Sequence, residues 1–514
     1  MPAKTSIRWW PAAVIFFAGL GFLLWARLGG DRTGQERFVQ SLITVFLTLV
    51  ALLLWFLLLS RLRWTIRLLG LSVVAVAVLA LTQSVRIRGV SGDLVPILAW
   101  RWTPQKHSAP STPHTGLGAV RGAEPALFDY PAFLGPHGDA TVRGIRLARD
   151  WSARPPREVW RRPIGAGWSA FSVVGNLAVT QEQRGEEELV VAYDLTTGEL
   201  LWVHADPGRY ETTVAGVGPR ANPTIADDRV YTVGGVGLLN ALDLATGETI
   251  WSRDILKDNG AANPEWGKSC SPLVLDDLVV VSAGGPAGRS LVAYHRETGQ
   301  PIWHGGSDRS GYSSPKVATL AGVRQILILN KASVAAHSPE TGEVLWQYPW
   351  SSDQPNVAQP VVLPGDRLLV SSGYGVGSKL LQISHDPGGG LQASLVWESP
   401  RLKAKFTNMV VHEGYIYGLD DGTLVCLDPE TGRRCWKRGR YGHGQMILVE
   451  DLLLITTEKG EVVLVEPSPE EHRELGRFTA LTGKSWNNPA LAGAYLLVRN
   501  HREAAMFELP LESS

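Results

Sequence analysis

The chain has 514 residues, which is too long for one small domain. Its 49 basic and 49 acidic residues balance, so no broad nucleic-acid-binding surface is expected. It has only three cysteines, Cys270, Cys426 and Cys435, which excludes a disulfide-dense scaffold and a CxxC zinc site.

Three long apolar runs open the sequence, at residues 9–28, 39–60 and about 66–85. Each is close to the roughly 20 residues that a helix needs to cross a bilayer. No small-residue cleavage pattern follows the first run, which favours retained helices over a signal peptide. The alternative is a buried helical hairpin of a soluble domain. We predict a membrane domain with three transmembrane helices over residues 1–90.

The basic residues predict the orientation of these helices. Lys4 and Arg8 precede the first run, and the loop after the second run is basic, with Arg61, Arg63 and Arg67. Because basic residues favour the cytoplasmic side, everything after the third run should lie on the extracytoplasmic, periplasmic side of the inner (plasma) membrane. Arg86 and Arg88 lie on the side that this rule disfavours. Residues 91–150 are rich in Pro, Gly and Ser and are predicted to form a linker and a lead-in segment.

One eleven-residue stretch recurs through the rest of the chain. ALDLATGETIW at 241–251 has four relatives, AYDLTTGELLW, AYHRETGQPIW, AHSPETGEVLW and CLDPETGRRCW. Counting copies that have lost the motif, the closing aromatic residues lie 39 to 52 residues apart, at Trp160, Trp202, Trp251, Trp303, Trp346, Trp397, Trp436 and Phe478. Such a spacing, with short alternating strands between turns, is typical of the four-stranded blades of a β-propeller.

Each repeated residue has a structural explanation. We expect Asp243 and Thr246 to hydrogen-bond within the turn, and Gly247 to supply its positive φ. Trp251 is the large apolar group that packs on the neighbouring blade, and burying about 200 Å² of it is worth a gross ~5 kcal/mol. The motif is therefore structural rather than catalytic.

The count of strands predicts how the propeller closes. Seven blades end between Trp202 and Phe478, and only three strands follow Phe478. Residues 156–164 look like a fourth strand without a blade, so pairing the two pieces would complete an eighth blade. We predict an all-β, eight-bladed β-propeller over residues 151–514, preceded by three transmembrane helices. In it Trp160 should fill the place that Trp251 fills in its own blade.

The A-x-D-x-x-T-G-x-x-x-W pattern resembles the tryptophan-docking repeat of the PQQ-like (quinoprotein-type) eight-bladed propellers. That family includes dehydrogenases that use pyrroloquinoline quinone (PQQ) and the propeller lipoprotein of the outer-membrane β-barrel assembly machinery. The stretch FLGPHG at 133–138 is similar to a segment found ahead of many such propellers. The resemblance to dehydrogenases would imply PQQ and Ca²⁺. The chain has no adjacent cysteine pair and no CxxCH haem sequence, which argues against carrying these cofactors over.

Candidate site residues precede the innermost strand of each blade, where eight loops would meet at one mouth of the channel. They are Trp168, Arg220, Asn222, Trp266, Lys268, Tyr312, Lys405, Asn408, His443, Trp486 and Asn487. Cations beside aromatic faces suit a planar anion or an acidic peptide. The alternative is ordinary loop polarity with Trp packing under the rim.

The sequence alone is compatible with two functions. The first is a membrane-anchored extracytoplasmic propeller that binds a protein partner or small ligand at its mouth. The second is a PQQ-dependent dehydrogenase that oxidises alcohols or sugars and passes electrons to the membrane. Cys426 and Cys435, which flank PETG, are expected to face each other across a hairpin, either as a disulfide or as two small buried residues.

Overall fold

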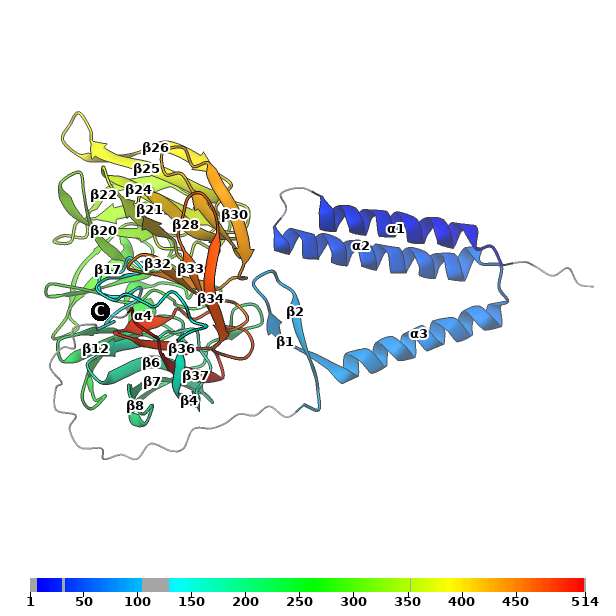
Figure 1. The fold of residues 1–514 in the computed structure, drawn as a ribbon, viewed down its shortest axis with the longest axis horizontal. Helices are drawn as coiled ribbons and strands as arrows, with labels where there is room; N and C mark the ends of the chain where they lie inside the picture. Colours follow the sequence, from blue (N-terminus) through cyan, green and yellow to red (C-terminus); the bar gives the residue numbers. More distant parts are fainter. Residues whose placement is uncertain (1–6, 30–32, 104–128, 352, 513–514) are drawn as a thin grey trace, which may run out of the picture. The chain divides into compact units, whose positions relative to one another are not determined.

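The computed structural model describes residues 7–29, 33–103, 129–351 and 353–512, so most of the predicted linker lies outside the described residues. The chain forms two compact units, residues 1–107 with 213–215, and the remainder. The boundaries predicted between domains stay a prediction. Each unit is described by itself, and Figure 1 shows the elements of both.

The first unit contains three helices that are long and apolar enough to cross a membrane. They are α1 (Trp10–Leu28), α2 (Gly34–Leu54), which continues into the π-helical turn η1 (Trp55–Leu59), and α3 (Trp64–Ser84). Helix α2 begins five residues before the predicted apolar run, because Thr33 and Glu36 form a capping box at its start. A two-stranded antiparallel hairpin, β1 (Val85–Val90) and β2 (Pro96–Trp100), follows α3.

The second unit is an eight-bladed β-propeller, as predicted. Blade one consists of β5 (Ser172–Val174), β6 (Leu177–Arg184), β7 (Glu187–Asp194) and β8 (Leu200–Pro207). Blade two consists of β11 (Thr224–Ala226), β12 (Arg229–Val233), β13 (Leu238–Asp243) and β14 (Thr249–Asp254). Blade three consists of β15 (Leu273–Leu275), β16 (Leu278–Gly285), β17 (Arg289–His295) and β18 (Pro301–Gly305). Blade four consists of β19 (Lys316–Leu320), β20 (Val323–Leu329), β21 (Ser333–His337) and β22 (Val344–Pro349). Blade five consists of β23 (Val361–Leu363), β24 (Arg367–Ser372), β25 (Gly377–His385) and β26 (Leu391–Ser399). Blade six consists of β27 (Val410–His412), β28 (Tyr415–Asp420), β29 (Thr423–Leu427) and β30 (Arg434–Arg440).

Blade seven contains β31 (Gln445–Val449), β32 (Leu452–Thr456), β33 (Glu461–Glu466), β34 (Arg473–Thr479) and a short parallel strand, β3 (Thr141–Val142). Blade eight contains β35 (Ala490–Ala492), β36 (Tyr495–Arg499), β37 (Glu503–Glu508) and β4 (Arg157–Pro163). Strand β4 pairs antiparallel with β37, and Trp160 lies opposite Met506. The predicted closure by an N-terminal strand is confirmed. Short elements between blades are β9 (Glu211–Thr212), β10 (Gly216–Val217) and α4 (Ile255–Asn259).

Tryptophans join six of the eight blades to the next. The indole N–H of Trp251 donates to the backbone oxygen of Arg296 in the following blade at 2.8 Å. Five more indoles make the same bond at 2.8–3.0 Å, those of Trp160, Trp202, Trp303, Trp397 and Trp436. Because Trp160 of blade eight donates to Leu195 of blade one, this contact runs through the closing seam, and Trp160 has the predicted place.

The motif glycine has a second role that the sequence did not reveal. Gly247 has a φ of +73°, as the turn requires, and it also receives the Trp202 ring of the preceding blade on its bare Cα. A Cβ added there would lie 2.7 Å from Trp202 Cδ2. Glycines 198, 299, 342 and 432 receive Trp160, Trp251, Trp303 and Trp397 in the same way. The glycine therefore serves both the turn and the blade-to-blade contact.

Two blades depart from this pattern. Blade five has lost the motif, and Trp346, which precedes it, donates instead to Gln325 Oε1 of its own blade at 2.6 Å. The side chain of Phe478 has no N–H to donate. Its ring packs edge-on against Phe507 of blade eight, with centroids 4.8 Å apart, and against Trp151, with centroids 5.7 Å apart. Aromatic packing therefore replaces the hydrogen bond where blade seven meets the closing blade.

The predicted facing of Cys426 and Cys435 is confirmed in part. Cys426 pairs with Trp436, and a β-bulge before Leu427 leaves Cys435 outside the paired register, but the Cys435 thiol still interacts with the Cys426 thiol. All three cysteines are free, with Cys426 buried and Cys435 exposed. Burial raises the pKa of the Cys426 thiol to about 12. A bulge at the equivalent place recurs in other blades, for example between Ala241 and Leu242.

The double role of the glycine is testable by comparing Gly247→Ala with Gly414→Ala. Both positions have positive φ, +73° and +80°, but a Cβ at Gly414 meets no atom within 4 Å. Both variants should lose about 1–2 kcal/mol to backbone strain. Gly247→Ala should lose a further ~1–3 kcal/mol because the Trp202 ring must move. Thermal unfolding of the purified full chain checks this, and equal losses for the two variants would contradict the docking role.

Candidate functional site

The predicted site residues lie at one end of the propeller channel. The innermost strands, β5, β11, β15, β19, β23, β27, β31 and β35, stand at one edge of the four-stranded order in their blades, apart from β31, which is flanked by β3. The loops that lead into them therefore meet at the same mouth. The structure divides the predicted residues into two groups, one that clamps neighbouring blades together and one that forms a ring of aromatic and basic side chains.

The predicted asparagines belong to the clamps. Asn222 Oδ1 accepts the N–H of Ala170 from blade one at 2.8 Å. Asn408 Oδ1 accepts the N–H of Gln359 from blade five at 3.1 Å. Asn487 Nδ2 donates to backbone oxygens of Gly167 and Ser169 of blade one, at 3.2 and 2.8 Å. All three asparagines are buried, so their amides hold inner strands in place.

Lys268 is also a clamp rather than an open cation. Its side chain is buried, and Nζ donates to the backbone oxygens of Ser282 and Ala283 and to Ser310 Oγ, at 2.9, 2.7 and 2.9 Å. These three bonds use the three donors of an ammonium group. Burial lowers the pKa of Lys268 to about 8. The proposed contact of Lys268 with a ligand carboxylate would require this network to open.

The second group begins with two tryptophans whose rings contact each other at a tilt. The rings of Trp168 and Trp486, from blades one and eight, lie 5.0 Å apart, and Phe406 of blade six lies 4.8 Å from Trp486. Lys484 Nζ stands over both indoles, 4.8 Å from Trp168 and 3.8 Å from Trp486. The indole N–H of Trp486 donates to Glu458 Oε1 at 2.9 Å. The predicted His443 is buried against Phe406, with ring centroids 5.3 Å apart.

The other half of the ring is built around Trp266. Its indole stacks on Tyr312 at 5.2 Å and meets Tyr374 of blade five at 6.2 Å. Lys405 Nζ lies 4.4 Å above the Tyr374 ring. Lys405 is the neighbour of Phe406 in the sequence, so the two halves join there.

The ring closes through Arg220. The guanidinium lies 5.0 Å from the Tyr210 ring, and the Tyr210 hydroxyl donates to the backbone oxygen of Pro264 at 2.9 Å, beside Trp266. On its other side Arg220 Nη2 donates to the backbone oxygen of Gly216 at 3.0 Å, and a Cβ at Gly216 would lie 3.1 Å from the Trp168 ring. We call this ring the collar. It consists of Trp168, Tyr210, Arg220, Trp266, Tyr312, Tyr374, Lys405, Phe406, Lys484 and Trp486.

The collar holds its charges in a partly dry environment. Burial lowers the pKa of Lys484 to about 8 and that of Arg220 to about 10. Behind Arg220, burial raises the pKa of the Glu188 carboxyl to about 7, and Glu188 Oε2 accepts the N–H of Val236 at 3.4 Å. A desolvated cation binds an anion more strongly than one in water, because the local dielectric constant is lower.

Four collar residues were missed by sequence reasoning. Tyr210, Tyr374, Phe406 and Lys484 are not among the predicted residues, although Phe406 and Lys484 lie within two residues of predicted ones. Tyr210 comes from the long connection between β8 and β11, and Tyr374 from the turn between β24 and β25. The unusual length of the first connection is the signal that could have found Tyr210.

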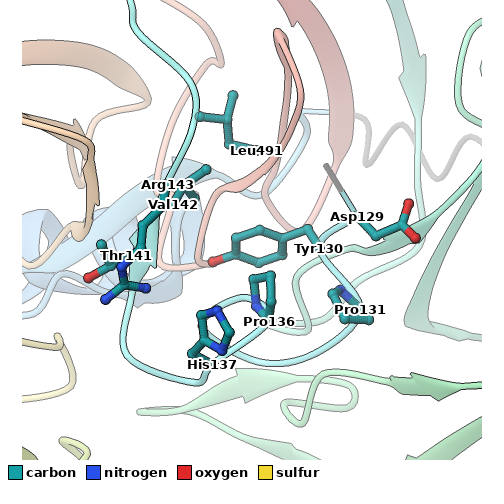
Figure 2. Close-up of a pocket in the computed structure, with 9 residues that line it drawn as sticks. All are labelled: Asp129, Tyr130, Pro131, Pro136, His137, Thr141, Val142, Arg143 and Leu491. Carbon is teal, nitrogen blue, oxygen red and sulfur yellow. The ribbon is translucent and has the colours of Figure 1, made fainter. Parts of the chain in front are cut away.

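At the other end of the inner strands lies the lead-in segment, residues 129–142. Tyr130 bridges to Val173 of blade one, and Thr141 pairs with Leu448 of blade seven. A cavity of about 340 Å³ lies here, and Figure 2 shows the residues that line it, with the Tyr130 ring between Pro136 and Leu491. Tyr130 is buried, which raises the pKa of its hydroxyl. The predicted mouth residues do not line this cavity.

Comparison with known proteins agrees with the repeat pattern. The sequence profile of the family described as outer membrane protein assembly factor BamB matches residues 186–438. BamB of Shewanella oneidensis is 22% identical over 295 residues, which cover 54% of this chain and 71% of that protein. The repeats of this chain are therefore similar to those of the PQQ-like β-propeller family. 

Dehydrogenases of the same PQQ-like fold are also similar. The dehydrogenase subunit of the quinone alcohol dehydrogenase from Acetobacter aceti is 26% identical over 260 residues, which cover 44% of this chain and 33% of that subunit. The solved structure of a europium-containing methanol dehydrogenase superposes with a TM-score of 0.57 at 14% identity, covering 74% of this chain and 98% of that one. At this identity the superposition shows the fold alone.

The mouth of this PQQ-like propeller does not fit a quinone with its metal ion. Lys484 lies over the Trp486 ring and Tyr312 stacks on the Trp266 ring, so one face of each indole is already in contact with the protein. Among the residues that the structure describes, no three His, Cys, Asp or Glu side chains cluster as a metal-ligating group. We therefore derive no chemical step through PQQ.

The raised pKa of Glu188 predicts a pH dependence of stability. Burial shifts this pKa from 4.5 to about 7, so between these values the folded protein holds a proton that the unfolded chain has lost. Folding stability should therefore fall as the pH rises from about 4.5 to 7, by at most about 3 kcal/mol. Glu188→Gln should remove this slope, so its melting temperature relative to the wild type should rise between pH 5 and pH 8. Glu187→Gln, at the exposed neighbouring position, should run parallel to the wild type, and parallel curves for both variants would refute the assignment.

Proposed function

We propose that this chain is a membrane-anchored PQQ-like propeller that binds an acidic segment of a protein partner at the collar, on the extracytoplasmic side. The collar itself carries the proposal. Its aromatic rings come from loops around the mouth, and the side chains of Arg220, Lys405 and Lys484 lie beside these rings. An extended chain with carboxylates can meet several of these groups at once.

The burial of the collar supports an interface. Apart from Lys405, which is buried, each collar residue is half-buried, so part of each ring and of the Arg220 and Lys484 side chains faces the mouth. Aromatic and arginine side chains in such a partly buried state are the usual anchors of protein interfaces. The similarity to proteins that are described as assembly factors supports a protein partner.

The placement outside the cytoplasm rests on the helices and their basic loops. Three candidate spans precede the propeller, and Arg61, Arg63 and Arg67 lie at the junction of the second and third. A cytoplasmic position for this basic loop puts the end of α3 on the opposite side.

Photocrosslinking from the collar tests the proposal. Tyr374→p-benzoylphenylalanine should capture a partner when the full chain is irradiated in its native membrane. The matched control is Ile302→p-benzoylphenylalanine on the outer strand of blade three, where Ile302 is 51% exposed. Equal capture from both positions, or capture from Ile302 only, would place the interface elsewhere.

Charge removal then tests the acidic character of the partner. Lys484→Gln should weaken capture from position 374 about fivefold, the equivalent of ~1 kcal/mol for one charge-assisted contact. Lys257→Gln, an exposed lysine of α4 outside the collar, should leave capture unchanged. An unchanged yield with Lys484→Gln would disprove the role of this cation.

The dehydrogenase alternative is tested on the same purified protein. PQQ and Ca²⁺ are added to the full chain, and the quinone absorbance is followed through gel filtration. Because Lys484 lies over Trp486 and Tyr312 stacks on Trp266, we expect the absorbance to elute with the free cofactor. Coelution with the protein, followed by reduction of a dye with alcohols or sugars, would favour the enzyme instead.

A further inference from the structure

The hairpin that follows the third span has one apolar and one basic face. In its register Val85 pairs with Trp100 and Ile87 with Leu98, so these four side chains share a face. Ile87, Leu98 and Trp100 are 58%, 63% and 52% exposed. Trp102, which is 67% exposed, stacks on Trp100 with centroids 5.1 Å apart.

The opposite face of the hairpin carries arginine. Arg86 pairs with Ala99 on that face, and Arg88 lies two residues further along the strand and is exposed. Arg86 Nη2 donates to the backbone oxygen of Thr103 at 2.9 Å. The hairpin is thus amphipathic, and its large apolar side chains are not buried by the unit to which it belongs.

The register of the hairpin also fixes where Trp100 and Trp102 lie relative to the end of α3. Helix α3 has 21 residues and is therefore about 31 Å long, close to the ~30 Å of a bilayer's hydrocarbon core. Strand β1 starts at Val85, directly after the helix, and β2 returns so that the N–H of Arg101 donates to the oxygen of Ser84 at 2.8 Å. Trp100 and Trp102 are therefore held at the end of the membrane span. This is the depth at which tryptophan is enriched in membrane proteins.

The far end of the hairpin reaches the same membrane surface. A Cβ added at Gly34, the first residue of α2, would collide with the carboxylate of Asp93 in the hairpin turn. Because successive spans run in opposite directions, the start of α2 and the end of α3 lie on the same side of the membrane. Both ends of the hairpin are thus tied to that side, and Figure 1 shows β1 and β2 between these two helix ends.

We propose that residues 85–103 form an interfacial hairpin that lies in the membrane surface at the end of α3. Ile87, Leu98, Trp100 and Trp102 enter the boundary between headgroups and acyl chains, and Arg86, Arg88 and Arg101 reach lipid phosphates. The occupant of the apolar face is the bilayer because the face is continuous with an apolar span. Arg86 and Arg88, which lie on the side of the membrane where basic residues are disfavoured, then bind lipid headgroups.

Neighbouring positions on the two faces give a matched test. Leu98→Cys and Ala99→Cys are made separately in a full chain whose exposed Cys435 is replaced by serine, and each is spin-labelled in nanodiscs of phosphatidylcholine and phosphatidylglycerol. Collision rates with oxygen, which concentrates in the bilayer, and with a water-soluble nickel chelate are then measured. The label at 98 should show a severalfold higher ratio of oxygen to nickel accessibility than the label at 99.

Each other outcome overturns the proposal. Equal, nickel-accessible labels would place both faces in water. Low accessibility of both labels to both reagents would mean that protein covers the hairpin. An NBD label at position 98, quenched by brominated lipid only if the side chain reaches the acyl chains, gives a second readout that does not depend on the label at 99.

Discussion

The contact of an indole ring with a bare glycine in the next blade organises the propeller. The Trp ring can lie flat on the turn only because Gly198, Gly247 and its equivalents carry no Cβ, and the indole N–H then reaches the carbonyl at the start of the same turn. One residue thus satisfies a hydrogen bond and buries a large apolar ring. Each blade has a free sheet face without its neighbour, so the contact makes the blades depend on one another.

This dependence becomes circular at Trp160. The ring of Trp160 packs on Gly198 of blade one while β4 pairs with β37 of blade eight, so the start and the end of the propeller share one sheet. Closure leaves no blade with an unpartnered face. It also places the lead-in segment, which precedes β4, against the far ends of the inner strands, where β3 pairs with β31. The mouth with the collar is at the other end.

The fold was predictable because it repeats, and the site was less so because it does not. Spacing of the Trp residues gave the blades, and counting strands gave the role of Trp160. The pairing of Cys426 with Trp436 could not be predicted, since the bulge before Leu427 is not visible in a local pattern. For the site, the position before an inner strand led to Trp168, Arg220 and Trp266. It could not separate these from Asn222 or Lys268, because clamp and collar residues occupy the same loops.

The clamp residues and the collar residues have separate roles. Asn222, Asn408 and Asn487 already tie the inner strands of neighbouring blades, and the indoles tie the outer strands. The fold therefore does not need a further ring of contacts at the mouth. Yet Lys484 is held over two indoles at a depth that lowers its pKa to about 8, which costs free energy that a shorter polar loop would avoid. Glu458 offsets part of this cost, and the remaining cost agrees with the binding role proposed for the collar.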